Sequence, residues 1–400
     1  MSLYRIVLIV MFIPMLLSLV TGKRAKANIF DMLCFGHAAW ATLALVKWGG
    51  LAQGLESGGI YVVEFCGAFL LGRLYIRSYE DFRAFANAYV GVTVGMLLFT
   101  LPEAVTGNHI LHDFFASAVG SPSAPYIGKR MGLERAFGPF DHPILYGVFS
   151  AAAFSMAYFV VAQRQLLNFK GMAQVIGVIV ATFVSASGGP YVVLIMQMFA
   201  AGWERVFARV KNRWRIMFGL FAAAYICIDL MSTRTPFHVF VSYFTFSTQS
   251  AYNRINIWNF GTAEVGRHPI FGIGLGDWVR PPWMSASVDN FWLLVAMRYG
   301  LPALLMLLGL MLGMVYMIAQ KENLSQEWRN ARHAWAFTLY GIAIAAATVH
   351  LWNALFVLFM FLMGSGMWLY DTKQGQTNDN KPRARPSALS TQKSKYGTLF

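Results

Sequence analysis

Charge is scarce in this sequence, which predicts a membrane protein. Asp, Glu, Lys and Arg make up 12% of the 400 residues, apolar residues make up 57%, and the mean hydropathy is +0.51. A soluble globular domain carries about a quarter of its residues as charged side chains, so the shortage excludes that class. The apolar runs are about 17 to 22 residues long, which suits membrane-spanning helices and not the alternating strands of a barrel. We therefore expect an all-α polytopic membrane protein.

Cysteine is also scarce, and this excludes a disulfide framework. Cys34, Cys66 and Cys227 each lie inside an apolar run, where a thiol is most often a small packing residue. Their spacing to histidine matches no metal site. The first apolar run, 3–20, is followed by no small-residue cleavage site, so we interpret it as a retained helix and not as a signal peptide.

The apolar runs predict about eleven membrane-spanning helices in one domain, 1–370. The expected helices lie near 3–20, 29–47, 57–72, 84–102, 143–162, 171–187, 190–203, 215–231, 289–319, 334–350 and 353–370. The 289–319 run is too long for one straight span, and Gly300-Leu301-Pro302 should divide it into a short piece and a full crossing. The polar tail, 371–400, should be disordered.

The net charge of +14 raises the question of nucleic-acid binding, but the positions of the basic residues argue against it. Most of the Lys and Arg residues lie in one alternate set of short loops and in the tail, as the positive-inside rule describes. We expect those loops and the tail to be cytoplasmic. The long inserts 103–142 and 232–288 should then be periplasmic, and an odd number of spans puts the N-terminus on that side as well.

The first insert ends in a polar segment at the mouth of the next expected helix. Arg135, Asp141 and His142 lie within eight residues there. One interpretation is an anion site, with Arg135 and His142 contacting substrate. The alternative is a solvated loop with an arginine that anchors the helix at the interface. The sequence leaves the two equally open.

The second insert gathers more candidates. Within 36 residues it holds Arg254, Trp258, Arg267, His268, Asp277, Trp278, Arg280 and Asp289. An arginine fork matches phosphate oxygens and stays charged at working pH, so several arginines near the lipid headgroups suit a diphosphate. The tryptophans are either interfacial anchors or platforms for sugar rings.

Three glycines in the same insert could bring backbone N–H groups close to an anion. Gly272, Gly274 and Gly276 alternate with apolar residues. The pattern is weak by itself, and the missing βαβ context excludes a dinucleotide site.

Asp289 is the candidate general base, because it stands where the large insert meets the following helix. A helix N-cap is at least as good an explanation, and the two roles are compatible. Asn290 beside it is a candidate substrate contact, and His268 is the rival base. Glu64 and Asp229 are acids inside apolar runs, which keeps a proton-coupled transporter as a competing hypothesis.

These segments, taken in order, resemble the O-antigen ligase and Wzy-type polysaccharide polymerase superfamily of bacterial inner membranes. Residues 135–143 are similar to that family's Arg-x-x-Gly-x-x-x-x-Pro segment, and 185–190 falls where the family has a Ser-Arg-Gly type turn. Residues 254–276 resemble its large periplasmic loop, and 289–300 resemble the signature that follows. The helix order matches over roughly residues 60 to 370, and the motifs cover about a quarter of that region.

Two departures shift the resemblance toward a polymerase. Ligases of the family typically have His before the Asn, whereas this chain has Asp289, and the turn lacks its arginine because Gly188 follows Ser187. An anion contact must then come from elsewhere, with Arg135 as the candidate.

The resemblance implies a GT-C-like membrane glycosyltransferase that needs no metal and no cofactor. Its donor would be a glycan on undecaprenyl diphosphate, its acceptor another lipid-linked repeat unit, and its possible partners chain-length or export proteins. The catalytic residues would be Asp289, His268 and Arg254. The alternatives are a ligase that transfers the glycan to lipid A-core, and a lipid-linked glycan flippase or proton-coupled transporter.

Overall fold

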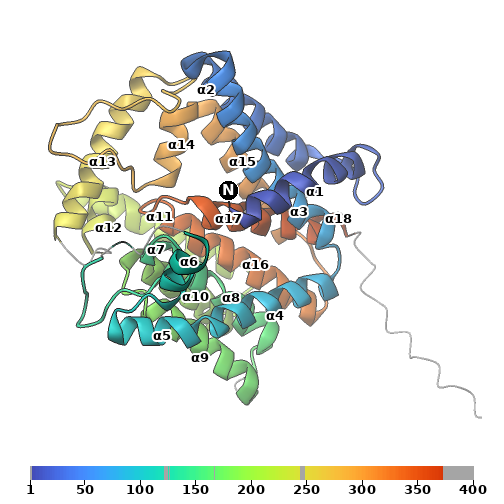
Figure 1. The fold of residues 1–400 in the computed structure, drawn as a ribbon. Helices are drawn as coiled ribbons and strands as arrows, with labels where there is room; N and C mark the ends of the chain where they lie inside the picture. Colours follow the sequence, from blue (N-terminus) through green and yellow to red (C-terminus); the bar gives the residue numbers. More distant parts are fainter. Residues whose placement is uncertain (1, 121–124, 126, 166, 244–247, 373–400) are drawn as a thin grey trace, which may run out of the picture.

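A computed structural model describes residues 2–120, 125, 127–165, 167–243 and 248–372. Every regular element in that part of the chain is a helix, as expected (Figure 1). The elements are α1 (Leu3–Val20), α2 (Ile29–Val62), η1 (Val63–Gly67), α3 (Ala68–Tyr75), α4 (Tyr79–Gly95), α5 (Leu97–Thr106), α6 (Ile110–Val119), α7 (Pro143–Ala152), α8 (Phe154–Met156), η2 (Ala157–Val161), α9 (Phe169–Phe183), α10 (Gly188–Val206), α11 (Arg213–Met231), α12 (Pro236–Tyr243), α13 (Thr248–Arg267), α14 (Phe291–Tyr299), α15 (Leu301–Ala319), α16 (Gln326–Ala345), α17 (Asn353–Ser365) and α18 (Met367–Asp371).

Seven segments of the described residues are long and apolar enough to cross a membrane, which fits a multi-pass membrane protein. They are Leu3–Val20, Ile29–Tyr75, Tyr79–Thr106, Pro143–Val161, Arg213–Met231, Leu301–Ala319 and Asn353–Asp371. The count of eleven stays a prediction. The predicted count is higher for two reasons. It includes the short helix α9 and the more polar helices α10 and α16, and it divides 29–75 into two spans.

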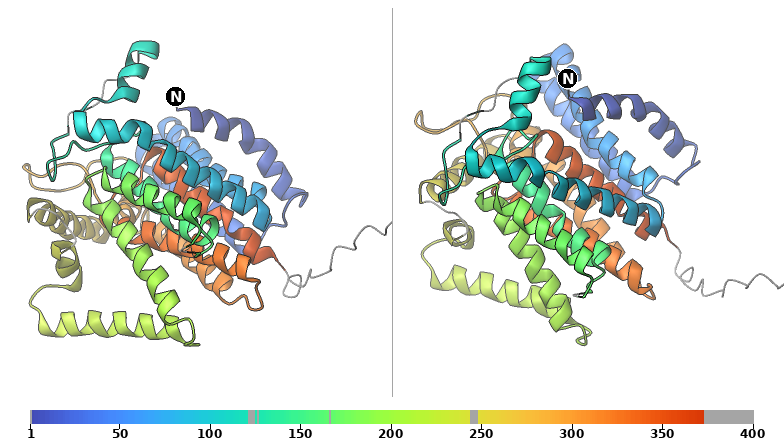
Figure 2. Two further views of the ribbon diagram at one scale, coloured as in Figure 1. Left: turned by 90° about the horizontal axis from the view of Figure 1, so that it is seen from below. Right: turned by 60° about the horizontal axis from the view of Figure 1, so that its bottom comes forward.

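That division of 29–75 agrees with the backbone, because α2 turns back on itself at Gly50. This residue has φ 74° and ψ 174°, which is far from helical. Beyond it, a Cβ on Gly54 would lie 2.4 Å from Val46 Cα, and one on Gly58 would lie 2.5 Å from the Thr42 methyl group. The two halves of α2 are therefore antiparallel and in close contact, as the views in Figures 1 and 2 also show.

The expected break after Tyr299 is confirmed, and it ties the second insert to the bundle. Helix α14 ends at Tyr299, Gly300 has φ 84°, and α15 begins at Leu301. A Cβ on Gly300 would lie 2.0 Å from the Ile270 carbonyl oxygen, so only glycine fits there. The Leu301 N–H donates to the Pro269 carbonyl at 2.7 Å.

Basic residues hold the helices together at the end of the bundle that lies opposite the second insert. Arg73 is 1% exposed, and its guanidinium donates to Asp31 at 3.2 Å, to the Lys26 carbonyl at 3.1 Å and to Asp371. We call this region, with the neighbouring Lys321 and Arg332, the basic end.

The start of the tail also belongs to the basic end, which moves one predicted boundary. Asp371 is the last residue of α18 and is paired with Arg73, and the Thr372 carbonyl accepts from Lys321 Nζ at 3.0 Å. The prediction of disorder from residue 371 is therefore wrong for these two residues. Residues 373–400 lie outside the described part of the chain.

Helix α11 differs from the other long helices because it projects from the bundle. Its apolar window is only 6% buried, against 78% for Pro143–Val161. Figure 2 shows it running away at a sharp angle from the end of α10. Its exposed apolar surface suits contact with lipid.

Candidate functional site

The ends of the helices opposite the basic end surround a cavity of about 190 Å³ with a charged lining. Four segments that are distant in sequence form it, and we call it the charged cavity. Its lining consists of Arg130, Arg135, His142 and Ile144, Gly188 and Gly189 at the start of α10, Ser250, Asn253 and Arg254 of α13, and Asp289. Four predicted site residues, Arg135, His142, Arg254 and Asp289, are thus brought together.

Glu103 of α5 fixes the backbone beside Arg135. This carboxylate is 2% exposed and accepts from the N–H groups of Phe137 at 2.9 Å and Gly138 at 3.1 Å. It also lies 2.7 Å from His109 Nδ1. Sequence reasoning missed Glu103 as a positioning residue, although a carboxylate at the end of an apolar run was a visible signal.

Arg135 extends from this fixed segment to the 185–190 turn. Its side chain is buried, and Nη2 donates to Ser187 Oγ at 2.7 Å, while Nε has no hydrogen-bond partner among the described residues. Burial, and then the charge of Arg130, lowers the pKa of Arg135 to about 10, so the group stays protonated at neutral pH. Arg135 therefore brings a guanidinium from a distant loop to the 185–190 turn.

His142 is a neutral hydrogen-bond donor at the cavity wall. Its Nδ1 caps α7 by accepting from the Ile144 N–H at 3.1 Å. Burial, and then the charge of Arg135, lowers the pKa of His142 to about 4. The ring is then neutral at pH 7, and because Nδ1 accepts a hydrogen bond, the proton is assigned to Nε2. His142 is suited to contact an anion and not to act as a base.

Three polar residues of α13 face the cavity because of helical spacing. Ser250, Asn253 and Arg254 are three and four residues apart and so share one face, while Ile257 one turn later is buried in an apolar cluster. Burial lowers the pKa of Arg254, and the nearby carboxylate of Asp289 opposes this shift. The same spacing in sequence could have identified Ser250 and Asn253.

Asp289 is the carboxylate of the cavity, and it does not cap α14. The cap is Asn290, whose Oδ1 accepts from the Leu293 N–H at 3.0 Å. The expectation that Asp289 serves as the N-cap is therefore wrong, and Asn290 has a structural task. Asp289 accepts from Ser287 Oγ at 2.9 Å and lies close enough to His142 and Arg254 to affect both electrostatically.

The charged residues of segment 264–280, which is the end of α13 and the loop that follows it, are paired with one another and do not line the cavity. Glu264 is 3% exposed, accepts from Arg267 at 2.5 Å and from the Val279 N–H at 3.1 Å, and lies 3.5 Å from His268 Nε2. Arg280 pairs with Asp277 in the same loop. The charged cavity is therefore out of reach of Arg267, Arg280 and the rival base His268.

The three glycines of that loop hold it against α14, and their N–H groups are occupied. Gly272 donates to the His268 carbonyl, Gly274 to the Arg298 carbonyl, and Gly276 to the Ile273 carbonyl, at 3.0, 2.9 and 3.1 Å. A Cβ on Gly272 would lie 2.3 Å from the Met297 carbonyl oxygen. The geometry thus assigns these glycines to packing and does not support the predicted anion contact.

The two candidate tryptophans also lie outside the cavity lining. Trp278 is buried among the side chains of an apolar cluster, and its Nε1 donates to the Ala286 carbonyl at 3.1 Å. Trp258 is one turn beyond Arg254 on α13 and is 36% exposed. Neither offers a ring face to the charged cavity.

A second pocket of about 170 Å³ lies beside the first, and we call it the aromatic pocket. Its lining consists of Tyr61, Glu64, Phe291, Leu294, Val295, Arg298, Tyr299, His350, Leu351, Trp352, Asn353 and Phe356. Asn353 Nδ2 donates to Asp141 Oδ2 at 2.7 Å, and the rings of Trp352 and His142 are 6.2 Å apart. The 350–353 segment of the aromatic pocket is therefore in contact with the 141–142 segment at the edge of the charged cavity.

Comparison with protein-family models and with curated proteins finds no match to this chain. The functional argument therefore depends on the geometry of the charged cavity and on the residues that surround it.

Proposed function

We propose that this protein is a membrane glycosyltransferase that polymerises undecaprenyl-diphosphate-linked oligosaccharide units at the periplasmic face of the bacterial inner membrane. One observation carries the proposal. Three arginines, a neutral histidine and one carboxylate meet in a single cavity at the end of a helix bundle, and three distant segments contribute them. Three cations against one anion favour a multiply charged ligand.

The arginines suit the leaving group of such a reaction. As the bond between the anomeric carbon and the diphosphate oxygen breaks, the electron pair stays with the diphosphate and its negative charge grows. Arg130, Arg135 and Arg254 are positioned to stabilise this charge without reorganisation, which is an effective form of catalysis. Nε2–H of His142 adds a neutral donor.

Asp289 suits the acceptor side of the reaction. The acceptor hydroxyl oxygen forms the new bond to the anomeric carbon, and its proton passes to the Asp289 carboxylate. The interaction of Asp289 with Arg254 links the base to the diphosphate site.

The aromatic pocket has the composition expected for the acceptor sugar. It combines ring faces, Trp352 and Tyr61, with hydrogen-bonding groups such as His350 and Asn353. Burial, and then the charge of Arg298, lowers the pKa of His350 to about 4, so its ring is neutral at pH 7. The neutral ring can donate a hydrogen bond to the sugar, but at this pKa His350 is, like His142, not suited to act as a base.

The two competing hypotheses, a proton-coupled transporter and a ligase, differ in how well the structure supports them. The contacts of Glu64 do not favour a proton carrier, because it accepts from Arg5 Nε at 2.6 Å and from Tyr4 at 3.2 Å. The ligase alternative uses the same cavity, and only the acceptor differs.

A deletion strain separates these hypotheses. For a polymerase, we expect the envelope to lose polymer and to retain single repeat units. A ligase would instead leave undecaprenyl-linked polymer and uncapped lipid A. An unchanged glycan profile, with the purified protein inactive on lipid-linked repeat units, contradicts both enzyme hypotheses.

A further inference from the structure

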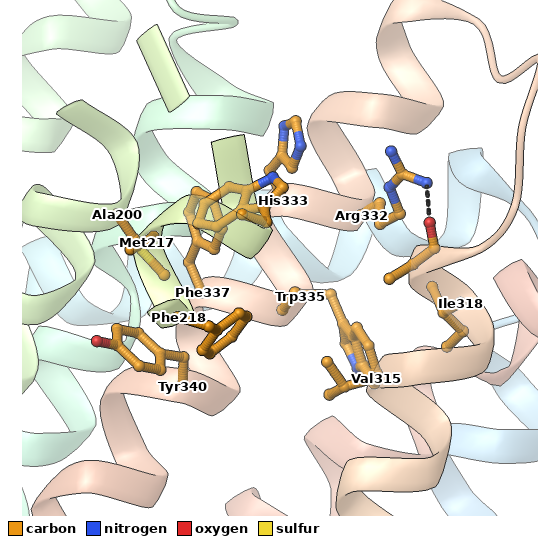
Figure 3. A pocket seen from close by; sticks show the side chains of 13 residues that line it. Ala200, Met217, Phe218, Val315, Ile318, Arg332, His333, Trp335, Phe337 and Tyr340 are labelled. Carbon is orange, nitrogen blue, oxygen red and sulfur yellow. Dashed lines mark hydrogen bonds between the residues drawn. The ribbon is translucent and has the colours of Figure 1, made fainter. Parts of the chain in front are cut away.

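A third pocket lies toward the basic end, far along the helices from the charged cavity. It has a volume of about 250 Å³ and is lined by apolar residues of α10, α11, α15 and α16. Figure 3 shows Met217 and Phe218 of α11 facing Val315 and Ile318 of α15 across it. We call it the apolar pocket.

The place of this pocket in the fold opens it to lipid. Its α11 wall belongs to the helix that projects from the bundle and whose apolar window is only 6% buried (Figure 2). The pocket therefore adjoins exposed apolar surface in a protein with several membrane-spanning segments. A hydrocarbon chain is the natural occupant of such a space.

Positive charge surrounds the mouth of the pocket. Arg332 lines it and donates through Nη1 to the carbonyls of Ala319 and Lys321, at 3.3 and 2.8 Å, which places the mouth at the basic end. Arg164, Arg213 and Arg329 also lie close enough to act electrostatically on its neighbour His333.

Little acid opposes this charge. Glu204 is close to Arg332, and it forms two hydrogen bonds with Arg213, at 2.7 and 3.1 Å. Arg164, Arg329 and Arg332 remain as excess cations. The mouth is therefore complementary to an anionic headgroup.

The buried ring of His333 is an independent observation that points to a ligand at this pocket. It is 7% exposed and lines the pocket, and its Nδ1 is buried with no hydrogen-bond partner among the described residues. Its Nε2 lies 3.9 Å from Glu204, which is too long for a hydrogen bond, so the ring proton is not tied to that nitrogen. A headgroup or ester oxygen at Nδ1 would satisfy it.

We propose that the apolar pocket binds one anionic glycerophospholipid, with an acyl chain between α11 and α15 and the phosphate beside Arg332 and His333. The charge lies at the basic end, whereas a polyprenyl diphosphate in the charged cavity has its charge at the opposite end. This difference favours a phospholipid of the leaflet at the basic end. The site does not depend on the proposed function.

Native mass spectrometry of the full chain, purified in mild detergent, tests this site. The wild type should retain one anionic glycerophospholipid, and Ala336→Trp, which fills the pocket, should lose it. Arg332→Gln should reduce the retained fraction several-fold, and Arg332→Lys should keep most of it. Arg83→Gln removes an exposed cation of α4 that does not line the pocket, and it should change nothing.

A second measurement covers variants that fold poorly. Added phosphatidylglycerol should raise the thermal midpoint of the wild type more than phosphatidylcholine does, and Arg332→Gln should abolish the difference. Equal effects of the two lipids on the wild type, retention of a polyprenyl lipid, or undiminished phospholipid in Ala336→Trp would each overturn the proposal.

Discussion

Two charged regions at the same end of the bundle behave in opposite ways. In the 264–280 segment, Glu264 and Asp277 neutralise Arg267 and Arg280, which lie three residues away. In the charged cavity, cations from distant segments converge and outnumber the carboxylate. Pairing between near neighbours in sequence neutralises charge, while convergence across the fold concentrates positive charge in one cavity. Density of charge in sequence is therefore a poor guide to the site.

We expect the largest effect in a comparison of substitutions at Asp289 and Asp277. Asp289→Asn should lower polymerisation by about 10²- to 10⁴-fold, the usual result of removing a general base, because Asn cannot take the proton. Folding should be intact, since Asn290 caps α14. Rates of the purified variants on lipid-linked repeat units test this.

The matched control is Asp277→Asn, which alters an exposed carboxylate paired with Arg280. Its rate should stay within a few-fold of the wild type. If Asp289→Asn is equally active, Asp289 is not the base.

The next comparison concerns Arg254 in the charged cavity and Arg267 beside Glu264. Arg254→Lys keeps the charge but loses the planar fork, so it should reduce the rate by about 10²- to 10³-fold, as the loss of one oxyanion donor does. Arg267→Lys retains a cation beside Glu264 and should have little effect. Equal rates for the two variants at equal protein abundance would refute bidentate binding at Arg254.

The fold class follows from the sequence because composition and apolar length are local properties. The break at Gly300 was also predictable, since glycine and proline mark it directly. The turn at Gly50 was readable only as the interval between two apolar runs. The count of spans is harder, because helices such as α9 and α14 are shorter than a bilayer requires.

The site could be predicted only in part, for a physical reason. Arg135, His142, Arg254 and Asp289 were identifiable as ionisable residues at helix mouths. The separation of Arg254 from Arg267 was not, because it depends on which side of α13 and its following loop each side chain occupies. Glu264 decides this, as it draws Arg267 and His268 to itself.

The stabilities of two glycine variants test whether the loop after α13 holds α14 in place. Gly272→Ala places a Cβ 2.3 Å from the Met297 carbonyl oxygen at a residue with φ +58°, so it should destabilise the protein by about 1 to 3 kcal/mol. In Gly266→Ala, the new Cβ meets nothing within 4 Å and replaces a helical glycine, so stability should rise slightly. Thermal unfolding in detergent measures both. A neutral Gly272→Ala would mean that the loop does not hold α14.

The smallest expected effect is the pH dependence that His142 contributes. Its pKa is about 4 in the folded protein and near 6.5 when exposed, so between these values the unfolded chain binds more protons. The stability contributed by the neutral ring is complete above pH 6.5 and is lost as the pH falls toward 4. His142→Asn retains a capping side chain and cannot titrate, so its thermal midpoint should fall less between pH 7.5 and 5 than that of the wild type. His268→Asn, in the loop, controls for the loss of one imidazole. Identical falls in the wild type and His142→Asn would show that the ring is solvated in the fold, and His142 would then be free to carry charge to the diphosphate instead of donating as a neutral group.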